Sequence, residues 1–357
     1  MLSQWLSHLT QGGLFAAAAI LSIPIGTVFL ECAAALLPPR SSRQRALPER
    51  ATVLIPAHNE AAVISQTLTS VMAHRPDRAE VCVVADNCSD ETVAIAQQFG
   101  VTVIERHNQA QRGKGYALDY GLSHLADNPP EVVVMVDADC SVEAETMSLT
   151  MSQAHASQRP VQALYLMEMP PEPSAADSIS ALAFLVKNWV RPAGLDRLGL
   201  PCLLTGTGMA FPWSVIRSAP LASGNIVEDM QLGLDLAIAG YPPQFCAAAR
   251  LTGRLPSDKD AAKEQRTRWE HGQLSTLLTQ VPRLLKQAAL QRRVDLLALA
   301  LEMAVPPLSL LVLLWLSLFA LAWGAAFIGL SHGPEIIFSI EGSLMAIAIV
   351  AAWAKFG

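Results

Sequence analysis

The sequence predicts an α/β domain with a mainly parallel sheet, held at a membrane by helices near both ends of the chain. Two observations support this prediction. Between residues 51 and 136, short apolar runs rich in β-branched residues alternate with helical stretches, which is the pattern of repeated βαβ units. Long apolar segments with few charges flank this region, and they match the roughly 20 residues that a helix needs to cross a bilayer.

The composition describes a membrane-associated chain that is not basic. The 357 residues are 52% hydrophobic, with a formal net charge of -6 and a mean hydropathy of +0.33. Because nucleic-acid binding relies on a basic surface, this charge balance argues against nucleic acid as a partner. The six cysteines include no Cys-x-x-Cys pair, which favours reduced, buried thiols over a disulfide framework or a zinc site.

The first long apolar segment is predicted to be a transmembrane anchor within residues 1–39. Residues 14–37 are apolar except for Glu31, which lies near the end of the segment. A cleaved signal peptide is the alternative, but such a peptide begins with a basic region. Residues 1–13 contain neither lysine nor arginine, so the sequence favours an anchor.

Two further spans are expected in a C-terminal membrane region, residues 294–357. The apolar run over 294–330 is too long for one span and contains a Pro-Pro pair. We therefore expect an approach segment followed by a span at about 304–328. A last span is predicted at about 336–353, beyond a short polar loop.

Basic residues predict the orientation of the chain in the membrane. They follow the first span, precede the C-terminal membrane region and follow the last span: Arg40, Arg43, Arg45, Arg50, Arg292, Arg293 and Lys355. Positive charge marks the cytoplasmic side of a span. Residues 40–293 are therefore predicted to form the cytoplasmic domain of an integral protein of the inner or plasma membrane. Interfacial helices near 274–293 would contact membrane lipids.

The elements of the α/β domain follow one another in a regular order. Strands are predicted at 52–55, ended by Pro56, and at 81–85, 101–104 and 132–136. Helices are predicted at 60–72, capped by Asn59, from Ser89 or Asp90 to residue 99, at 114–125 and at 230–239. Ligands of parallel sheets bind at the carboxyl ends of the strands, so the residues that follow each strand are the candidate site.

Polar clusters follow three of the four predicted strands. The first two are His58-Asn59-Glu60 and Asp86 to Asp90, and the third is Asp137-Ala138-Asp139. Each cluster alone is explained by turn and cap formation. Two carboxylates one residue apart at the exit of a buried strand repel each other, and a bound Mg²⁺ or Mn²⁺ removes that repulsion. The third cluster is therefore a candidate metal site.

Three other segments carry further candidate residues. Arg112-Gly113-Lys114-Gly115 offers cations and backbone amides to a diphosphate, although a flexible basic loop would have the same sequence. Glu228-Asp229 precedes a helix, where acids also serve as caps. Gln265, Arg268 and Trp269 share one helix face, suited to a diphosphate and a sugar ring. An ordinary interfacial helix is the alternative for this last segment.

With these residues the chain resembles a family 2 glycosyltransferase, which implies the GT-A nucleotide-diphospho-sugar transferase fold. The resemblance runs from residue 51 to about 275 in the family's order. It rests on 53–60, 86–92, 137–139, 206–211, 227–229 and the Gln-x-x-Arg-Trp motif at 265–269. The flanking spans are similar to those of cellulose and hyaluronan synthases, with fewer spans and a shorter chain.

The resemblance assigns a role to each matching residue. Donor binding is implied for Pro56, Ala57, Glu60, Asp86 (at the nucleotide base), Lys114, Asp137 and Arg268. Asp139, helped by Asp137, would hold Mg²⁺ or Mn²⁺ as the cofactor, and Asp229, next to Glu228, would be the catalytic base. Acceptor contacts are implied for Gly206, Thr207, Gly208, Gln265 and Trp269.

The expected activity is a metal-dependent, inverting transfer of a hexose-type sugar from a UDP-sugar donor. The Gln-x-x-Arg-Trp motif favours a growing polysaccharide as the acceptor, with export or polymerisation subunits as partners. The small number of spans favours the alternative, transfer of one sugar to a membrane lipid. A catalytically inactive membrane scaffold is a third hypothesis, which the presence of both Asp139 and Asp229 disfavours.

Overall fold

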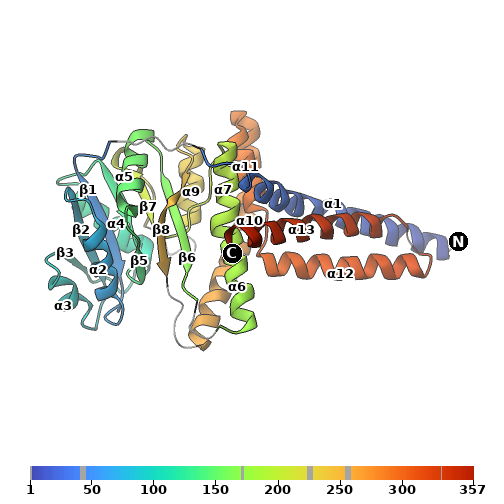
Figure 1. Ribbon diagram of the computed structural model, residues 1–357, viewed down its shortest axis with the longest axis horizontal. Helices are drawn as coiled ribbons and strands as arrows, with labels where there is room; N and C mark the ends of the chain where they lie inside the picture. Colours follow the sequence, from blue (N-terminus) through green and yellow to red (C-terminus); the bar gives the residue numbers. More distant parts are fainter. Residues whose placement is uncertain (1, 41–45, 170–172, 223–227, 254–258, 331) are drawn as a thin grey trace.

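The structure is a computed structural model that describes residues 2–40, 46–169, 173–222, 228–253, 259–330 and 332–357. Within these ranges, the side chains of residues 2–4, 6, 176, 259–266 and 268–270 lie outside the description. A sheet with helices on both faces forms one end of the molecule (Figure 1). A layer of helices adjoins the sheet, and three long helices project from that layer.

Eight strands form a single mixed sheet. They are β1 (Ala51–Ala57), β2 (Ala79–Asp86), β3 (Thr102–Arg106), β4 (Val132–Met135), β5 (Cys140–Val142), β6 (Val161–Met167), β7 (Met209–Pro212) and β8 (Gln244–Gly253). Their order is β3-β2-β1-β4-β7-β6-β8-β5. The first four neighbours pair in parallel, as predicted, whereas β7 is antiparallel to both β4 and β6. β8 is parallel to β6 and antiparallel to β5.

Some helices connect the strands, and the others form the adjoining layer and the helices that project from it. Those of the α/β domain are α2 (Ile64–His74), α3 (Thr92–Gln97), α4 (Lys114–Leu125), α5 (Thr146–Ser157), α8 (Trp213–Ile216) and α9 (Glu228–Ile238). The adjoining layer contains α6 (Ala175–Leu185), the π-helix η1 (Val186–Val190), α7 (Arg191–Leu198), α10 (Lys259–Gln291) and α11 (Val294–Met303). The projecting helices are α1 (Leu2–Ala35), α12 (Leu308–Phe327) and α13 (Pro334–Phe356).

The central strands are apolar throughout because both of their faces are buried. In β1, Val53 and Ile55 belong to the core shared with α2, α3 and α5. Leu54 points to the opposite face, where α4, α8 and α9 pack. A strand in which every residue is buried on one face or the other reads as a continuous hydrophobic run, which is why these strands could be predicted.

Two predicted boundaries at the first strand are wrong. Pro56 does not end β1, since the strand pairs with β2 as far as Ala57. Proline has no N–H to donate. The pairing of β1 with β4 therefore stops at Leu54, whereas its pairing with β2 continues. Asn59 does not cap a helix either. It adopts a left-handed φ of 54°, its side-chain oxygen accepts a hydrogen bond of 2.8 Å from the Ser89 amide, and α2 begins only at Ile64.

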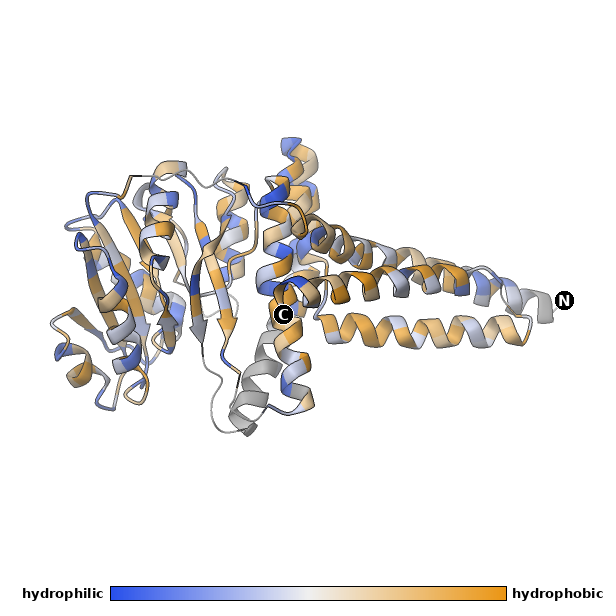
Figure 2. Cartoon of the chain, viewed as in Figure 1, coloured by the Kyte–Doolittle hydropathy of each residue, from blue (hydrophilic) through white to orange (hydrophobic). Residues whose placement is uncertain are grey.

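Among the residues that the structure describes, three helices are long and apolar enough to cross a membrane, in agreement with the three predicted spans. They are Ser7–Ala35 within α1, Leu308–Phe327 (α12) and Pro334–Phe356 (α13), and their apolar surfaces stand out in Figure 2. The turn between α12 and α13 lies beside the start of α1, where the Ser7 hydroxyl donates to the Leu330 carbonyl. That turn and the α/β domain therefore lie at opposite ends of the helical bundle (Figure 1).

Buried charges join the first membrane helix to the adjoining layer. The Arg191 side chain in α7 pairs with Glu31 of α1, with Nε and Oε2 2.5 Å apart. It also donates a hydrogen bond of 3.0 Å to the Glu302 carbonyl in α11, and all three residues are buried. Gly194 allows the helices to approach closely, because a Cβ there would lie 1.9 Å from the Glu31 carbonyl oxygen.

We predict that Arg191→Met lowers the free energy of unfolding by about 3–5 kcal/mol, because Glu31 would remain buried without its cation. Chemical unfolding in neutral detergent measures this loss. Arg283→Met is the control, since it removes a half-exposed pair with Asp235 and should cost less than about 1 kcal/mol. Equal losses in the two variants would show that the Arg191 pair is not structural.

Candidate active site

The predicted donor residues gather at the carboxyl ends of the parallel strands. Pro56 and Ala57 end β1, Asp86 ends β2, and Asp137 follows β4 by two residues. These three strands are adjacent in the sheet. The sheet topology therefore brings the clusters that follow β1, β2 and β4 to one edge, as the sequence predicted.

Lys114 connects this edge to the loop before β7. At the first residue of α4, its side chain forms an ion pair with the Asp137 carboxylate. It also donates a hydrogen bond of 2.7 Å to the carbonyl oxygen of Gly206. Burial lowers the pKa of Lys114, but the carboxylates of Asp137, Glu228 and Asp229 together outweigh burial and raise it above its usual range. Lys114 is therefore a fixed cation among acids, suited to an anionic ligand.

The loop 206–208 positions the acids, with its Thr207 side chain turned inward. Thr207 is only 1% exposed, and its hydroxyl accepts a hydrogen bond of 3.0 Å from the Asp137 amide. Gly206 has a φ of +91°, and a Cβ there would lie 3.2 Å from an Asp229 carboxylate oxygen. Gly208, with a φ of +66°, packs against Leu251. The acceptor role of this loop stays a prediction.

Asp137 and Asp139 fit a divalent cation. Burial and the neighbouring Asp137 raise the pKa of Asp139. The negative charge of the two carboxylates is therefore not fully balanced by Lys114. The pKa of Glu60 is also raised, to about 7, mainly by burial and then by the negative charges of Asp139 and Asp137. The described residues contain no group of three or more His, Cys, Asp or Glu able to hold a metal on their own. Two carboxylates plus ligand phosphate oxygens are what Mg²⁺ and Mn²⁺ accept.

A second acid pair faces the first from α9. Glu228 and Asp229 form the first turn of this helix, and both contribute to the charge environment of Lys114. Burial raises the pKa of Asp229, and Lys114 opposes this shift. Burial likewise raises the pKa of Glu228 to about 7, again opposed by Lys114. The helix is held from both sides, since Leu232 and Leu236 pack on the sheet and Met230 and Leu234 pack on α10 and α11.

Asp86 has a partner that the sequence analysis missed. Its Oδ1 accepts a hydrogen bond of 2.7 Å from Arg106 Nη1 and one of 3.0 Å from Asn87 Nδ2. Arg106 ends β3, the strand next to β2, and this adjacency is the signal that could have revealed it.

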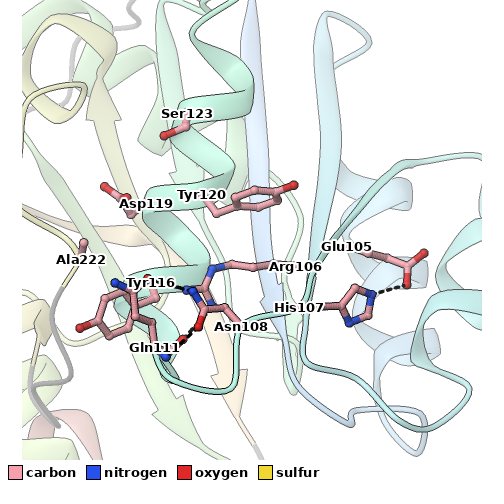
Figure 3. Close-up of a pocket in the computed structure, with 10 residues that line it drawn as sticks. All are labelled: Glu105, Arg106, His107, Asn108, Gln111, Tyr116, Asp119, Tyr120, Ser123 and Ala222. Carbon is pink, nitrogen blue, oxygen red and sulfur yellow. Dashed lines mark hydrogen bonds and ion pairs between the residues drawn. The ribbon is translucent and has the colours of Figure 1, made fainter.

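A cavity of about 520 Å³ lies beside Arg106, between the segment after β3 and α4. Figure 3 shows the Arg106 side chain next to Gln111 and Tyr116 on the wall of this cavity. The Gln111 carbonyl accepts a hydrogen bond of 2.8 Å from Arg106 Nη1. The lining residues do not include Asp137, Asp139 or Asp229, so the cavity adjoins Arg106, the partner of Asp86, and not the Asp137–Asp139 pair.

The Gln-x-x-Arg-Trp motif lies in α10, whose backbone spans Lys259–Gln291. The side chains of Gln265, Arg268 and Trp269 lie outside the described residues, so their predicted donor and acceptor roles stay predictions. The same holds for Val227, which precedes the second acid pair.

These features define the GT-A class of nucleotide-diphospho-sugar transferase folds: a mixed, mostly parallel sheet with acids and a lysine at its strand ends and a facing acid pair. The chain belongs to the family described as "Glycosyltransferase like family 2", whose sequence model matches residues 48–272. The resemblance to this family and its fold, proposed from the sequence, is thereby confirmed.

Known proteins similar to this chain differ in how much of it they match. A probable glycosyltransferase of Bacillus subtilis, YdaM, is 26% identical over 246 residues, which are 66% of this chain and 58% of that protein. A 4,4'-diaponeurosporenoate glycosyltransferase of Staphylococcus aureus is 33% identical over 91 residues, or 25% of this chain and 23% of that protein. The chain thus matches only part of the length of these relatives.

A solved structure shares the fold over nearly the whole chain. It is a mannosyltransferase from Pyrobaculum calidifontis in complex with GDP-Man and Mn²⁺, with a TM-score of 0.56 and 18% sequence identity. The alignment covers 96% of this chain and 99% of that one. The shared architecture therefore includes the helices outside the α/β domain.

Proposed function

We propose that this chain is a metal-dependent, inverting glycosyltransferase that moves a sugar from a UDP-sugar to a lipid acceptor at the membrane surface. The observation that carries the proposal is the meeting of two acid pairs around Lys114. One pair, Asp137 and Asp139, fits a metal and a diphosphate. The other, Glu228 and Asp229, fits a base.

The donor end of the site is supported by charge and by family membership. Lys114 and the Asp137–Asp139 pair suit a diphosphate with its divalent cation. The mannosyltransferase that shares the fold is described with a nucleotide-diphosphate sugar and Mn²⁺. Mg²⁺ and Mn²⁺ both suit carboxylate ligands, so either is the proposed cofactor. The uridine nucleotide is implied by the family resemblance, with Asp86 and Arg106 at its base.

In the proposed reaction, each residue acts at one point of an in-line displacement. Lys114 binds the departing diphosphate and offsets its growing charge. Asp137 and Asp139 would hold the divalent cation, which when bound acts as a Lewis acid on the same phosphates. Asp229 accepts the proton of the acceptor hydroxyl as that oxygen attacks the anomeric carbon. Attack opposite the leaving group inverts the configuration at that carbon.

The sugar-transfer rate should fall as the pH drops below about 7. The base acts only as a carboxylate, and burial raises the pKa of Glu228 to about 7 and that of Asp229 in the same direction. Because these neighbours titrate as a coupled pair, the acidic limb of kcat/KM should lie above the pKa of an ordinary aspartate. A profile that stays flat down to pH 5 would contradict the base assignment.

A lipid acceptor is supported by the architecture outside the α/β domain. The described residues contain three helices able to span a membrane, and relatives in Staphylococcus aureus are named for 4,4'-diaponeurosporenoate as acceptor. The growing polysaccharide predicted first remains a second candidate because it rests on the Gln-x-x-Arg-Trp motif. That reading would also require export or polymerisation subunits as partners.

Product extraction separates the two acceptors. Membranes containing the chain are incubated with labelled UDP-sugars and then partitioned between organic solvent and water. The lipid proposal predicts label in the organic phase as a single-sugar product. Label only in long water-soluble chains would contradict it and favour the polysaccharide. A membrane preparation with Asp139→Asn gives the background.

We further propose that the α/β domain faces the cytoplasm. Glu49 lies two residues before β1, whereas the His332 carbonyl accepts a hydrogen bond from Gln11, near the start of α1; β1 and the start of α1 lie at opposite ends of the molecule (Figure 1). Cysteines introduced at these two positions should react with a membrane-impermeant maleimide from opposite sides, with Glu49→Cys labelled only in inverted vesicles. Labelling of both positions from the same side would overturn the topology.

A further inference from the structure

A cation that the proposed mechanism does not use lies on the membrane side of the site. Lys187 belongs to η1, the five-residue π-helix between α6 and α7. η1 contacts β6 of the sheet on one side and the membrane helices α1 and α13 on the other. In Figure 1 the column α6–α7 stands between the sheet and the projecting helices. π-Helical turns are rare and occur frequently at functional sites.

The only hydrogen-bond partner of Lys187 among the described residues is neutral. Its Nζ donates to Gln273 Oε1 over 3.1 Å. Gln273 is oriented for this contact, because its Nε2 donates to the Val305 carbonyl over 3.4 Å. Within the described part of the chain, no carboxylate lies within ion-pair distance of Lys187. Among the described side chains, the ammonium group is therefore held in place by a neutral partner alone.

The neighbouring cations are already engaged. Lys114 pairs with Asp137 and donates to Gly206. Arg191, one helical turn from Lys187, pairs with Glu31. Of these three cations, Lys187 is thus the one without a close carboxylate partner among the described residues.

An electrostatic interaction links the Lys187 ammonium group to the Asp229 carboxylate. Burial lowers the pKa of Lys187, and Asp229 is the main group opposing this shift. Glu302 also opposes the shift, but it contributes less than Asp229. Lys187 is partly buried, and a partly buried cation without a close counter-ion carries a desolvation cost. An anionic group bound here would relieve that cost.

We propose that Lys187 binds an anionic group, a phosphate or carboxylate, of the lipid acceptor next to its attacking oxygen. This inference rests on the proposed function and adds a chemical class to the acceptor. The positive charge of Lys187 would offset the repulsion between that anion and Asp229, whose carboxylate already acts on the pKa of Lys187. It also places the binding group on the side from which a membrane lipid would arrive.

Equilibrium binding of simple lipids to the purified full-length chain in neutral detergent tests this proposal. The probes are labelled dodecyl phosphate and dodecanoate, with dodecanol as the uncharged match. The variants are Lys187→Met, which removes the charge, and Lys187→Arg, which keeps it. Lys286→Met is the control, because Lys286 is an exposed lysine on the same interfacial helix as Gln273. UDP binding with Mn²⁺ is measured in every variant.

At least one anionic probe should bind more tightly than dodecanol to the unmodified chain. Lys187→Met should weaken that binding roughly 10- to 100-fold, the effect of losing one hydrogen bond to a charged group. Lys187→Arg and Lys286→Met should largely retain it, and UDP binding should not change. Excess inorganic phosphate should not displace dodecyl phosphate, because the alkyl chain contributes to a lipid site.

Equal binding of dodecanol and the anionic probes, or equal binding by Lys187→Met and the unmodified chain, would overturn the proposal. Displacement by inorganic phosphate would overturn the lipid assignment and point to a free phosphate instead. Loss of UDP binding in Lys187→Met would assign Lys187 to the donor end or to structure. Absence of UDP binding in the unmodified chain would contradict the proposed function itself.

Discussion

Asp229→Asn is expected to slow sugar transfer about 10²- to 10⁴-fold, the contribution typical of a general base. Asparagine keeps the shape of the side chain but does not accept the acceptor proton. UDP affinity should hardly change, because Lys114 and the Asp137–Asp139 pair are the proposed diphosphate contacts. The measurement is turnover and UDP binding in the same preparation. The Lys114 pair with Asp137 should persist in this variant.

A helix-capping role for Asp229 predicts the opposite result. Asparagine caps helices about as well as aspartate, so both stability and turnover would survive. Glu228→Gln is the matched comparison, because it removes the neighbouring carboxylate from the same helical turn. We expect a smaller loss of turnover in that variant. Near-normal turnover in Asp229→Asn would remove this residue from the mechanism, and loss of UDP binding would place it in the donor site.

Asp139→Asn is expected to abolish metal-dependent transfer, with a loss of at least about 10²- to 10³-fold, as when one preorganised electrostatic contact is removed. The remaining carboxylate, Asp137, is already paired with Lys114. A divalent cation would therefore lose the ligand that is not shared. The readout is EDTA-sensitive sugar transfer, measured with expression and membrane insertion.

Asp127→Asn is the control for this substitution, because Asp127 is exposed just beyond the end of α4. It should leave transfer unchanged. Full activity of Asp139→Asn would show that the Asp137–Asp139 pair is only a turn. Activity that falls together with protein yield would indicate a folding defect.

The half of the sheet that carries the donor site could be predicted from the sequence. Strands β1, β2 and β4 are buried on both faces and read as apolar runs, with helices between them. The helix α4 was predicted with its observed bounds, Lys114–Leu125. The second half, from β5 to β8, was not predicted. It is mixed in direction, and its pairing depends on contacts between segments far apart in the chain.

The residues of the candidate site also differ in whether the local sequence could reveal them. Short local motifs revealed Asp137, Asp139 and Asp229, because acids after strands or at a helix start are visible in sequence. The contact of Lys114 with Gly206 joins residues far apart in the chain, and local patterns carry no information on it. The Thr207 hydroxyl lies beneath the Asp137 amide and accepts its hydrogen bond, a contact between distant segments that the local motif at 206–208 does not reveal. Arg106 and Lys187 lie outside every motif that was considered.

Binding of UDP to the purified full-length chain, measured by calorimetry with Mn²⁺ and then with EDTA, tests the central claim most directly. It requires neither the sugar nor the acceptor to be known. The proposed site predicts binding in Mn²⁺ that is lost in EDTA and strongly weakened by Asp139→Asn and by Lys114→Met. Absence of UDP binding, or binding of equal strength in EDTA, would contradict a metal-assisted nucleotide-sugar site at these strand ends.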